Sequence, residues 1–173
     1  NRAEYGLMDK PFFEQSEELL SSLPQPFYTK FITITNHYPF PLDEDLATIE
    51  KPETGNDIVD GYFQTARYAD EALEQFFQYL DETGLLENSL IIMYGDHHAL
   101  SEKYYEELSK LLDLEIGPVE SAGLQRVPLF IYMPGLKGGI KSTYGGQIDL
   151  FPTLLHLLGI ETKEYVHFGT DLL

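Results

Sequence analysis

The chain reads SLIIMYGDHH over residues 89–98, and this stretch decides the predicted fold. Its first six residues are almost all apolar, which is typical of a strand covered by helices on both faces of a parallel sheet. Two further stretches have the same character, FITIT at residues 31–35 and VPLFIY at residues 127–132. We therefore predict three strands of one sheet.

Helical periodicity separates these predicted strands. Apolar residues recur at spacings of three and four between Asp57 and Asp81, at Val59, Tyr62, Ala66, Ala69, Leu73, Phe76 and Leu80. Gly84 stands where a glycine that ends this helix is expected. Further helices are predicted from Ser101 to Leu112 and from Asp149 to Leu158. The alternation predicts an α/β fold with an open, mainly parallel sheet flanked by helices.

Composition narrows the classes of protein. The 173 residues fit one domain, and 29 acidic against 11 basic residues give a formal net charge of −18. That charge argues against a nucleic-acid binder and against electrostatic docking on anionic lipid. The chain has no cysteine, which excludes disulfides and thiolate metal sites. No apolar run approaches the roughly 20 residues of a membrane-spanning helix.

The residues GDHH at 95–98 are the first candidate for a functional site. Asp96 and His97 follow an apolar strand, and carboxylate and imidazole groups are suitable ligands for a divalent cation. Gly95 allows a sharp turn, so that adjacent side chains can converge. The alternative is a turn that begins the helix at Ser101, with solvated histidines at His97 and His98.

The second candidate is TNHYPF at residues 35–40. It also follows a predicted strand, so we expect His37 to lie on the same rim of the sheet as Asp96. The imidazole could bind a metal, transfer a proton or hold a phosphate oxygen. The alternative is a hydrogen-bonded loop histidine beside a Tyr-Pro turn.

Weaker candidates lie elsewhere. His156 is predicted to be a partly buried core residue of the last helix, and His167 could line the rim. The amides of residues 144–149 could meet an anion at a helix start, or simply close a turn. Arg67 is expected to pair with a neighbouring acid. No nucleophile elbow, Walker loop, dinucleotide fingerprint or His-Glu-x-x-His motif is present.

Five stretches occur in order along nearly the whole chain: FYTKFITITNHYPF at 27–40, DGYFQTARY at 60–68, YGDH at 94–97, QIDLFPTLL at 147–155 and FGTDL at 168–172. Together they resemble the extracellular catalytic domain of the lipoteichoic acid synthases, within the sulfatase and alkaline-phosphatase superfamily. The resemblance implies an enzyme at the outer face of a Gram-positive cell membrane, and it allows release of the catalytic domain.

The resemblance also implies a reaction. A threonine nucleophile attacks the phosphodiester of phosphatidylglycerol, diacylglycerol leaves, and a glycerophosphoryl-threonine intermediate forms. The terminal hydroxyl of a growing polyglycerolphosphate chain then attacks that intermediate. Mn²⁺ or Mg²⁺ activates the threonine and offsets charge on the phosphoryl oxygens. By this resemblance Asp96 and His97 are two metal ligands, and His37 contacts the glycerol-phosphate group.

The chain departs from that family in what it lacks. The family's other metal-binding glutamate, its threonine nucleophile and a substrate-binding arginine and tryptophan lie before the equivalent of Asn1, and this chain has no tryptophan. The resemblance therefore implies that residues 1–173 are a single partial catalytic domain without its N-terminal segment and its C-terminal end. We expect such a piece to be inactive alone and to leave an uncovered sheet edge.

Two alternatives remain open at the level of sequence. Another enzyme of the superfamily, such as a sulfatase, a phosphodiesterase or a phosphoethanolamine transferase, would use a similar metal site. A non-catalytic acidic surface domain would bind cations or a partner and use no nucleophile.

Overall fold

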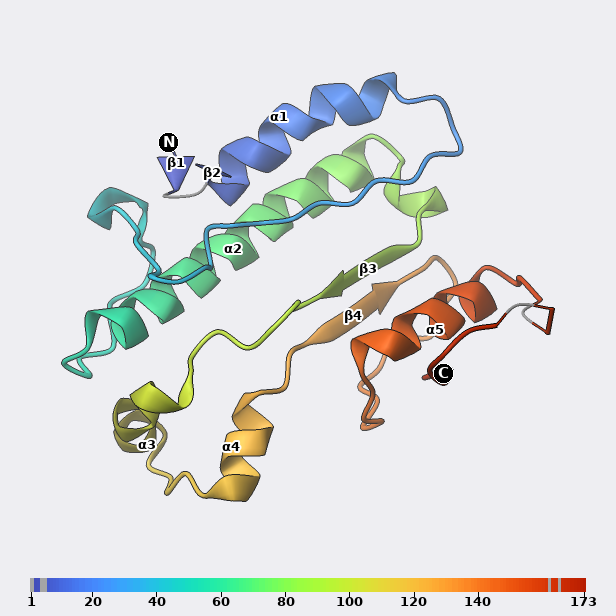
Figure 1. The fold of residues 1–173 in the computed structure, drawn as a ribbon. Helices are drawn as coiled ribbons and strands as arrows, with labels where there is room; N and C mark the ends of the chain where they lie inside the picture. Colours follow the sequence, from blue (N-terminus) through green and yellow to red (C-terminus); the bar gives the residue numbers. More distant parts are fainter. Residues whose placement is uncertain (1, 4–5, 162, 165) are drawn as a thin grey trace. The chain divides into compact units, whose positions relative to one another are not determined.

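The computed structural model describes residues 2–3, 6–161, 163–164 and 166–173. The chain divides into two compact units, residues 1–134 and residues 135–173. The strands and helices, drawn in Figure 1, are β1 (Arg2–Ala3), β2 (Gly6–Leu7), α1 (Asp9–Ser22), α2 (Asp57–Glu82), β3 (Ile91–Tyr94), α3 (Tyr105–Leu112), α4 (Pro118–Leu124), β4 (Leu129–Tyr132) and α5 (Leu150–Leu157). Short 3₁₀ turns lie at Glu44–Leu46, Leu86–Asn88, Glu102–Tyr104 and Gln147–Asp149. None of the helices formed by these described residues has the length and apolar character needed to cross a bilayer.

Helix α2 confirms the longest predicted helix. Asn56 precedes it, and its side-chain oxygen accepts a hydrogen bond from the backbone N–H of Ile58 at 3.1 Å. This bond satisfies one of the free amides at the helix start. Gly84, just beyond the helix, has a φ of +72°, the left-handed conformation in which glycine commonly ends helices.

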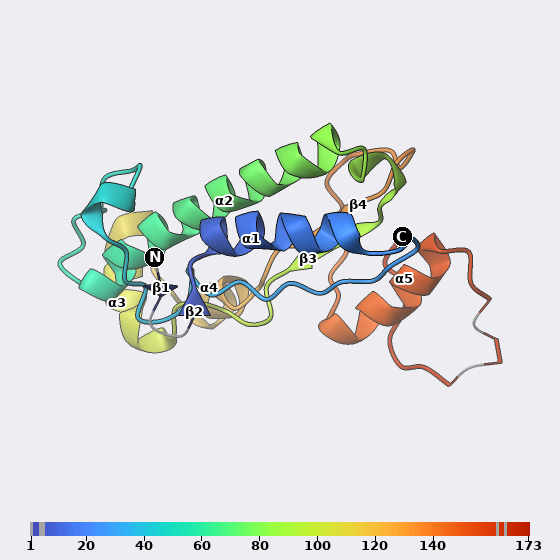
Figure 2. The same cartoon turned by 90° about the horizontal axis from the view of Figure 1, so that it is seen from above.

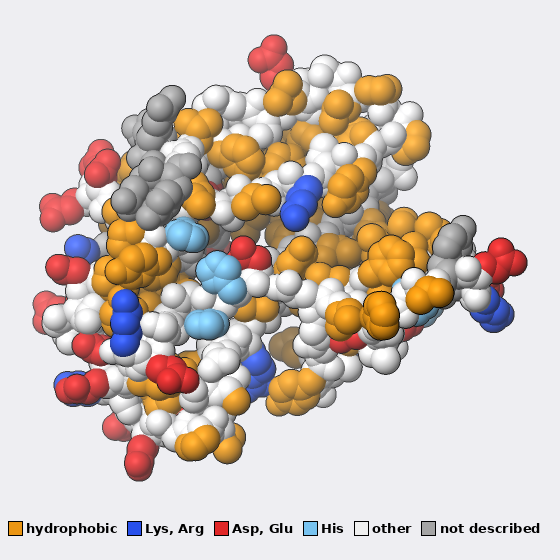
Figure 3. Space-filling view, viewed as in Figure 1, with side chains coloured by type: hydrophobic (Ala, Val, Ile, Leu, Met, Phe, Trp, Pro, Cys, Tyr) orange, Lys and Arg blue, Asp and Glu red, His pale blue; other side chains and the backbone are white. Residues whose placement is uncertain are grey.

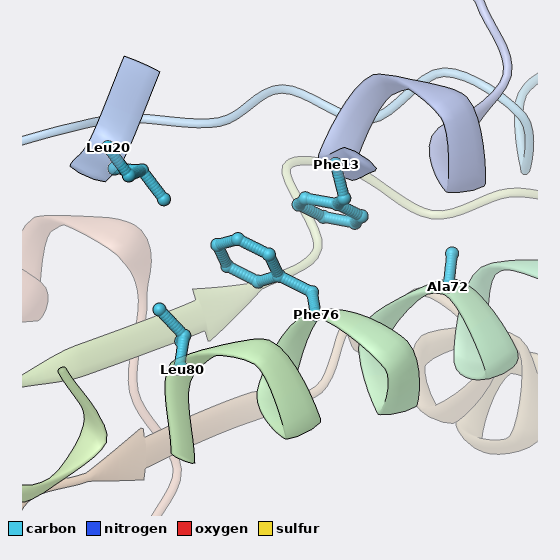
Figure 4. Packing of buried hydrophobic residues seen from close by; sticks show 5 residues of the cluster. All are labelled: Phe13, Leu20, Ala72, Phe76 and Leu80. Carbon is cyan, nitrogen blue, oxygen red and sulfur yellow. The ribbon is translucent and has the colours of Figure 1, made fainter. Parts of the chain in front are cut away.

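Helices α1 and α2 lie side by side and enclose one of the apolar clusters of the first unit (Figures 1 and 2). The Phe13 ring from α1 stacks on the Phe76 ring from α2, with centroids 4.5 Å apart. Leu20 continues the same contact toward Leu80, and Ala72 leaves room for the approach of α1 (Figure 4). Burial of these side chains is the main driving force for the pairing of the two helices.

Helices α1 and α4 were not among the predicted elements. Helix α1 begins after Met8, which offers no side-chain cap, and it carries Pro11 in its first turn. Helix α4 has seven residues and begins with Pro118, a favourable first helical residue. Neither Met8 nor Gly117, the residues directly before these helices, provides a side-chain cap, so the usual start signal is weak in both segments.

The α/β class is confirmed, but the direction of the strands differs from the prediction. Strands β3 and β4 pair in antiparallel fashion, with Ile91 opposite Tyr132 and Tyr94 opposite Leu129. The connection through α3 and α4 stays at the end where β3 finishes, so β4 returns along β3 in the opposite direction (Figure 1). An apolar run shows that a strand is buried, but it does not reveal which way its neighbour runs.

The prediction of a strand at residues 31–35 was wrong. These residues are extended but form no ladder with another strand of the described chain. Instead, the backbone N–H groups of Ile34 and Thr35 each donate to Asp9 Oδ1 at 3.0 Å. A carboxylate from α1 thus takes the place of a neighbouring strand, because amides in a buried segment need acceptors.

The second unit confirms the last predicted helix as α5. Its buried start is organised by Asp149, whose two carboxylate oxygens accept the backbone N–H groups of Gly146 and Thr170, each at 2.7 Å. These hydrogen bonds hold the pKa of Asp149 below its usual value. The Thr153 hydroxyl in turn accepts the backbone N–H of Leu172, so the last residues are attached to α5.

A charged cluster joins α1, α2 and the loop between them. The Glu71 carboxylate binds Lys10 Nζ at 2.9 Å and Arg67 Nε at 3.0 Å, and it accepts the Thr48 hydroxyl. The hydrogen bonds from Lys10 and then Thr48 lower the pKa of Glu71 below its ordinary value of 4.5. The expected pairing of Arg67 is confirmed, since Arg67 also binds Asp70 at 2.7 Å.

The lowered pKa of Glu71 predicts a pH-dependent contribution to stability. A depressed folded-state pKa stabilises the fold above 4.5, and that contribution disappears as the pH falls through the folded-state value. We expect Glu71→Gln to lower the free energy of unfolding by about 1 kcal/mol at pH 7. Urea denaturation between pH 7 and pH 3 should show this difference shrinking below pH 4.5.

The matched control for this measurement is Glu74→Gln, which removes the same charge from an exposed position on α2. It should have little effect at any pH, because exposed substitutions away from such contacts change stability by less than about 0.5 kcal/mol. A penalty for Glu71→Gln that is constant with pH would contradict the electrostatic account.

Candidate functional site

The loop after β3 presents a carboxylate and an imidazole to solvent. Asp96 and His97 are both exposed, and His97 Nε2 lies 3.6 Å from Asp96 Oδ1. His97 Nδ1 lies 2.9 Å from the backbone oxygen of His98. When Nδ1 carries the proton and donates to this oxygen, the Nε2 lone pair is available beside the carboxylate. The two side chains can therefore offer an oxygen and a nitrogen to one cation.

Position 95 requires glycine because a side chain would not fit there, and not because the backbone makes the expected sharp turn. Its φ is not in the left-handed region, but a Cβ at this position would lie 2.8 Å from Cβ of Val127. Its backbone N–H donates to the Pro128 oxygen at 3.2 Å. Glycine is needed here because the start of β4 crosses close to the Asp96 loop.

The loop of His37 lies beside the loop of His97. The two imidazole centroids are 6.2 Å apart with the rings nearly perpendicular, and Figure 3 shows histidine side chains gathered on one face. His37 Nδ1 lies 2.9 Å from the Tyr38 oxygen, the same arrangement as at His97. The expected proximity of the two histidine loops is therefore confirmed, although residues 31–35 form no strand.

A lysine makes a second connection between these loops. Lys103, in the turn that follows the Asp96 loop, places its ammonium 5.2 Å from the Tyr38 ring centroid and 4.7 Å from that of Tyr104. In such cation–π contacts the ammonium is attracted by the negative face of the aromatic ring. The contact holds the segment after His98 against the segment after His37.

The donor set fits a divalent cation in chemistry but supplies only part of a coordination shell. Carboxylate oxygen and imidazole nitrogen suit Mn²⁺, Mg²⁺ and related ions. No group of three or more His, Cys, Asp or Glu side chains able to hold a metal occurs within the described part of the chain. Asp96 and His97 would thus be two ligands of a larger set.

The other sequence candidates are described by their own exposure and partners. His98 is exposed next to His97. The expected burial of His156 was wrong, because its side chain is 62% exposed and binds Asp171 Oδ2 through Nδ1 at 2.5 Å. The Gly146 amide, considered as an anion site, is occupied by Asp149 of the chain itself. His167 belongs to the second unit, where its ring faces Phe151.

Sequence reasoning missed two buried residues beneath the His37 loop. Thr65 on α2 is fully buried, and its hydroxyl donates to Asn36 Oδ1 at 2.9 Å. Gly61, one turn earlier, meets the Phe40 oxygen so closely that a Cβ there would lie only 2.6 Å from it. A usable signal was present, because residues 61, 65, 68 and 72 follow helical spacing on the buried face and include a polar side chain.

Solved structures define the class of fold. The lipoteichoic acid synthase LtaP from Listeria monocytogenes matches with a TM-score of 0.77 and 30% identity, over 96% of this chain and 43% of that chain. A protein in the alkaline phosphatase superfamily from Vibrio parahaemolyticus matches with a TM-score of 0.69 and 22% identity, over 99% of this chain and 38% of that chain. The second likeness concerns the fold alone. The chain thus shares an α/β fold with part of both of these structures.

The family is shown by sequence. The Sulfatase family model matches residues 1–160, so the chain belongs to the sulfatase family. It is 57% identical over 167 residues to lipoteichoic acid synthase 1 of Bacillus subtilis. This alignment covers 96% of this chain and 26% of the relative. It is 51% identical over 172 residues to the lipoteichoic acid synthase of Staphylococcus aureus. This alignment covers 99% of this chain and 27% of the relative. The chain thus spans about a quarter of the length of these curated relatives.

The geometry predicts that Asp96 is a metal ligand. We expect Asp96→Asn to weaken Mn²⁺ binding about tenfold or more, because a neutral amide oxygen is a poorer ligand for a hard cation than a carboxylate. Electron paramagnetic resonance of free Mn²⁺ during a titration of the protein would measure this loss.

The matched control is Glu102→Gln, which removes an equal charge from an exposed position in the following turn. It should change the affinity by less than about twofold, as a screened surface charge would. Equal weakening by both variants would mean that Mn²⁺ responds to the acidic surface as a whole and that Asp96 is no ligand.

Proposed function

We propose that the chain is part of the catalytic domain of a metal-dependent phosphoglycerol transferase. This enzyme moves glycerol phosphate from phosphatidylglycerol to a growing lipoteichoic acid chain. One observation carries the proposal: the His37 loop meets the Asp96–His97 loop within one unit of a chain that is 57% identical to a lipoteichoic acid synthase.

Asp96 and His97 are proposed as two ligands of Mn²⁺ or Mg²⁺. Their convergence supports this role, since Asp96 Oδ1 and His97 Nε2 lie 3.6 Å apart and both are open to solvent. When bound, the cation would supply Lewis-acid stabilisation of phosphoryl oxygens and activation of a hydroxyl nucleophile. The remaining ligand and the threonine nucleophile are proposed to come from a segment outside these 173 residues, so the chain alone is expected to be inactive.

His37 is proposed to contact the glycerol-phosphate group. His37 Nδ1 lies 2.9 Å from the Tyr38 oxygen, and we assign the proposed substrate contact to the other ring nitrogen, Nε2. Neutral Nε2 accepts a hydrogen bond, such as one from a glycerol hydroxyl, and the protonated ring donates from Nε2 to a phosphate oxygen. Both kinds of partner occur on a glycerophosphate headgroup.

The net charge supports a site of this kind. A protein with a formal charge of −18 repels an anionic headgroup at long range. Local groups that can become cationic or hold a cation must therefore provide the attraction. His37, Asp96 and His97 supply such groups in one place.

The proposed location is the outer face of a Gram-positive cell membrane. The named relatives belong to Bacillus and Staphylococcus and are lipoteichoic acid synthases. The acidic surface offers no electrostatic attraction to anionic lipid, so access to phosphatidylglycerol is proposed to depend on a tethering helix outside these residues. Phosphatidylglycerol and the polyglycerolphosphate chain are the proposed substrates.

A chimera tests this function directly. These 173 residues would replace the matching segment of Bacillus subtilis lipoteichoic acid synthase 1, to which they are 57% identical. With Mn²⁺ and vesicles of phosphatidylglycerol, we expect release of diacylglycerol at a rate near that of the parent. Asp96→Ala in the chimera should lower that rate about a hundredfold or more, because a metal ligand is lost.

Two controls separate the alternatives. Glu102→Gln in the chimera should retain the activity, because Glu102 is an exposed residue outside the proposed site. Hydrolysis of a soluble sulfate ester with no release of diacylglycerol would favour a sulfatase instead. A folded chimera inactive on both substrates would favour a non-catalytic acidic domain.

A further inference from the structure

The segment that carries His37 is held from its upstream side by a buried carboxylate. Asp9 is 1% exposed, and its Oδ1 accepts the backbone N–H groups of Ile34 and Thr35. In return, the Thr35 hydroxyl, also 1% exposed, accepts the backbone N–H of Asp9 at 2.8 Å. Three hydrogen bonds thus fix the chain two residues before His37 to the start of α1.

Helix α2 holds the same segment on both sides of His37, at Asn36 before it and at Phe40 after it. The Thr65 hydroxyl donates to Asn36 Oδ1, the side chain directly before His37. Three residues after His37, the backbone of Phe40 rests on Gly61 with no room for a Cβ, and Phe40 has a φ of +61°. His37 therefore stands on a short stretch whose two ends are both attached to buried positions of helices.

We propose that Thr65 is a positioning residue for substrate binding that acts through Asn36 and His37. Asp9 holds the upstream end of the same stretch. The inference deepens the proposed function and rests on it, because it takes His37 as the group that contacts the substrate phosphate. A polar side chain buried completely on a helix face has a specific partner here, the residue adjacent to His37.

The competing role for Thr65 is purely structural. Its hydroxyl also lies 3.0 Å from the Gly61 oxygen, a common contact within a helix. A purely structural role would lower stability and, through a smaller folded fraction, the apparent kcat, and it would leave KM unchanged. A positioning role would affect substrate binding alone and would require His37.

Thr65→Val tests the role because valine keeps the shape and removes the hydroxyl. In the active chimera we expect the KM for phosphatidylglycerol to rise about fivefold while kcat stays within about twofold. Thr65→Ser, which restores a hydroxyl, should return KM toward the parental value. A fall in kcat with KM unchanged, or no rescue by serine, would overturn the proposal.

A double-mutant cycle with His37→Ala gives the decisive readout. If Thr65 acts through His37, Thr65→Val should change KM by less than about twofold in the His37→Ala background. Full additivity of the two changes would overturn the positioning role. Leu80→Ala on the same helix is the control: it should lower the melting temperature without a rise in KM, because Leu80 lies in the α1–α2 core.

The double-mutant cycle also distinguishes failure of the positioning role of Thr65 from failure of the proposed function. If His37→Ala raises KM and Thr65→Val adds to it in full, the proposed function stands and the positioning role fails. If His37→Ala leaves KM unchanged in an active chimera, the proposed substrate contact fails and the positioning role fails with it.

Discussion

The structure depends on how one extended segment satisfies its backbone amides. Residues 31–36 run beside α1 without a strand ladder, and Asp9 accepts the N–H groups of Ile34 and Thr35. A buried amide without an acceptor costs about as much as a lost hydrogen bond, so this carboxylate fixes the path of the segment. Because His37 follows directly, the same bonds decide where its ring lies relative to His97.

The candidate site is built at the meeting of two loops with different supports. Asp96 and His97 follow a strand, and Gly95 lets the start of β4 pass close beneath them. His37 follows an extended segment attached to two helices. The first loop carries the proposed cation ligands and the second carries the proposed phosphate contact, a division that suits transfer between phosphodiesters.

The sequence predicted the parts of this molecule that depend on local pattern. Helix α2 followed from the spacing of its apolar residues and from its end at Gly84, and Asp96 with His97 followed from residue type and place after a strand. The antiparallel pairing of β3 and β4 and the burial of Thr65 depend on contacts between distant segments. Neither a strand's direction nor a hydroxyl's partner leaves a periodic signal, which is why Thr65 resembled any polar helix residue.

One measurement shows whether His37 shares a site with Asp96 and His97. Mn²⁺ added at a small fraction of an equivalent broadens nuclear magnetic resonance signals of nearby groups, and Mg²⁺ provides the diamagnetic control. We expect the ring signals of His37 and His97 to broaden together, since their centroids are 6.2 Å apart. Broadening of His97 while His37 stays sharp would contradict it.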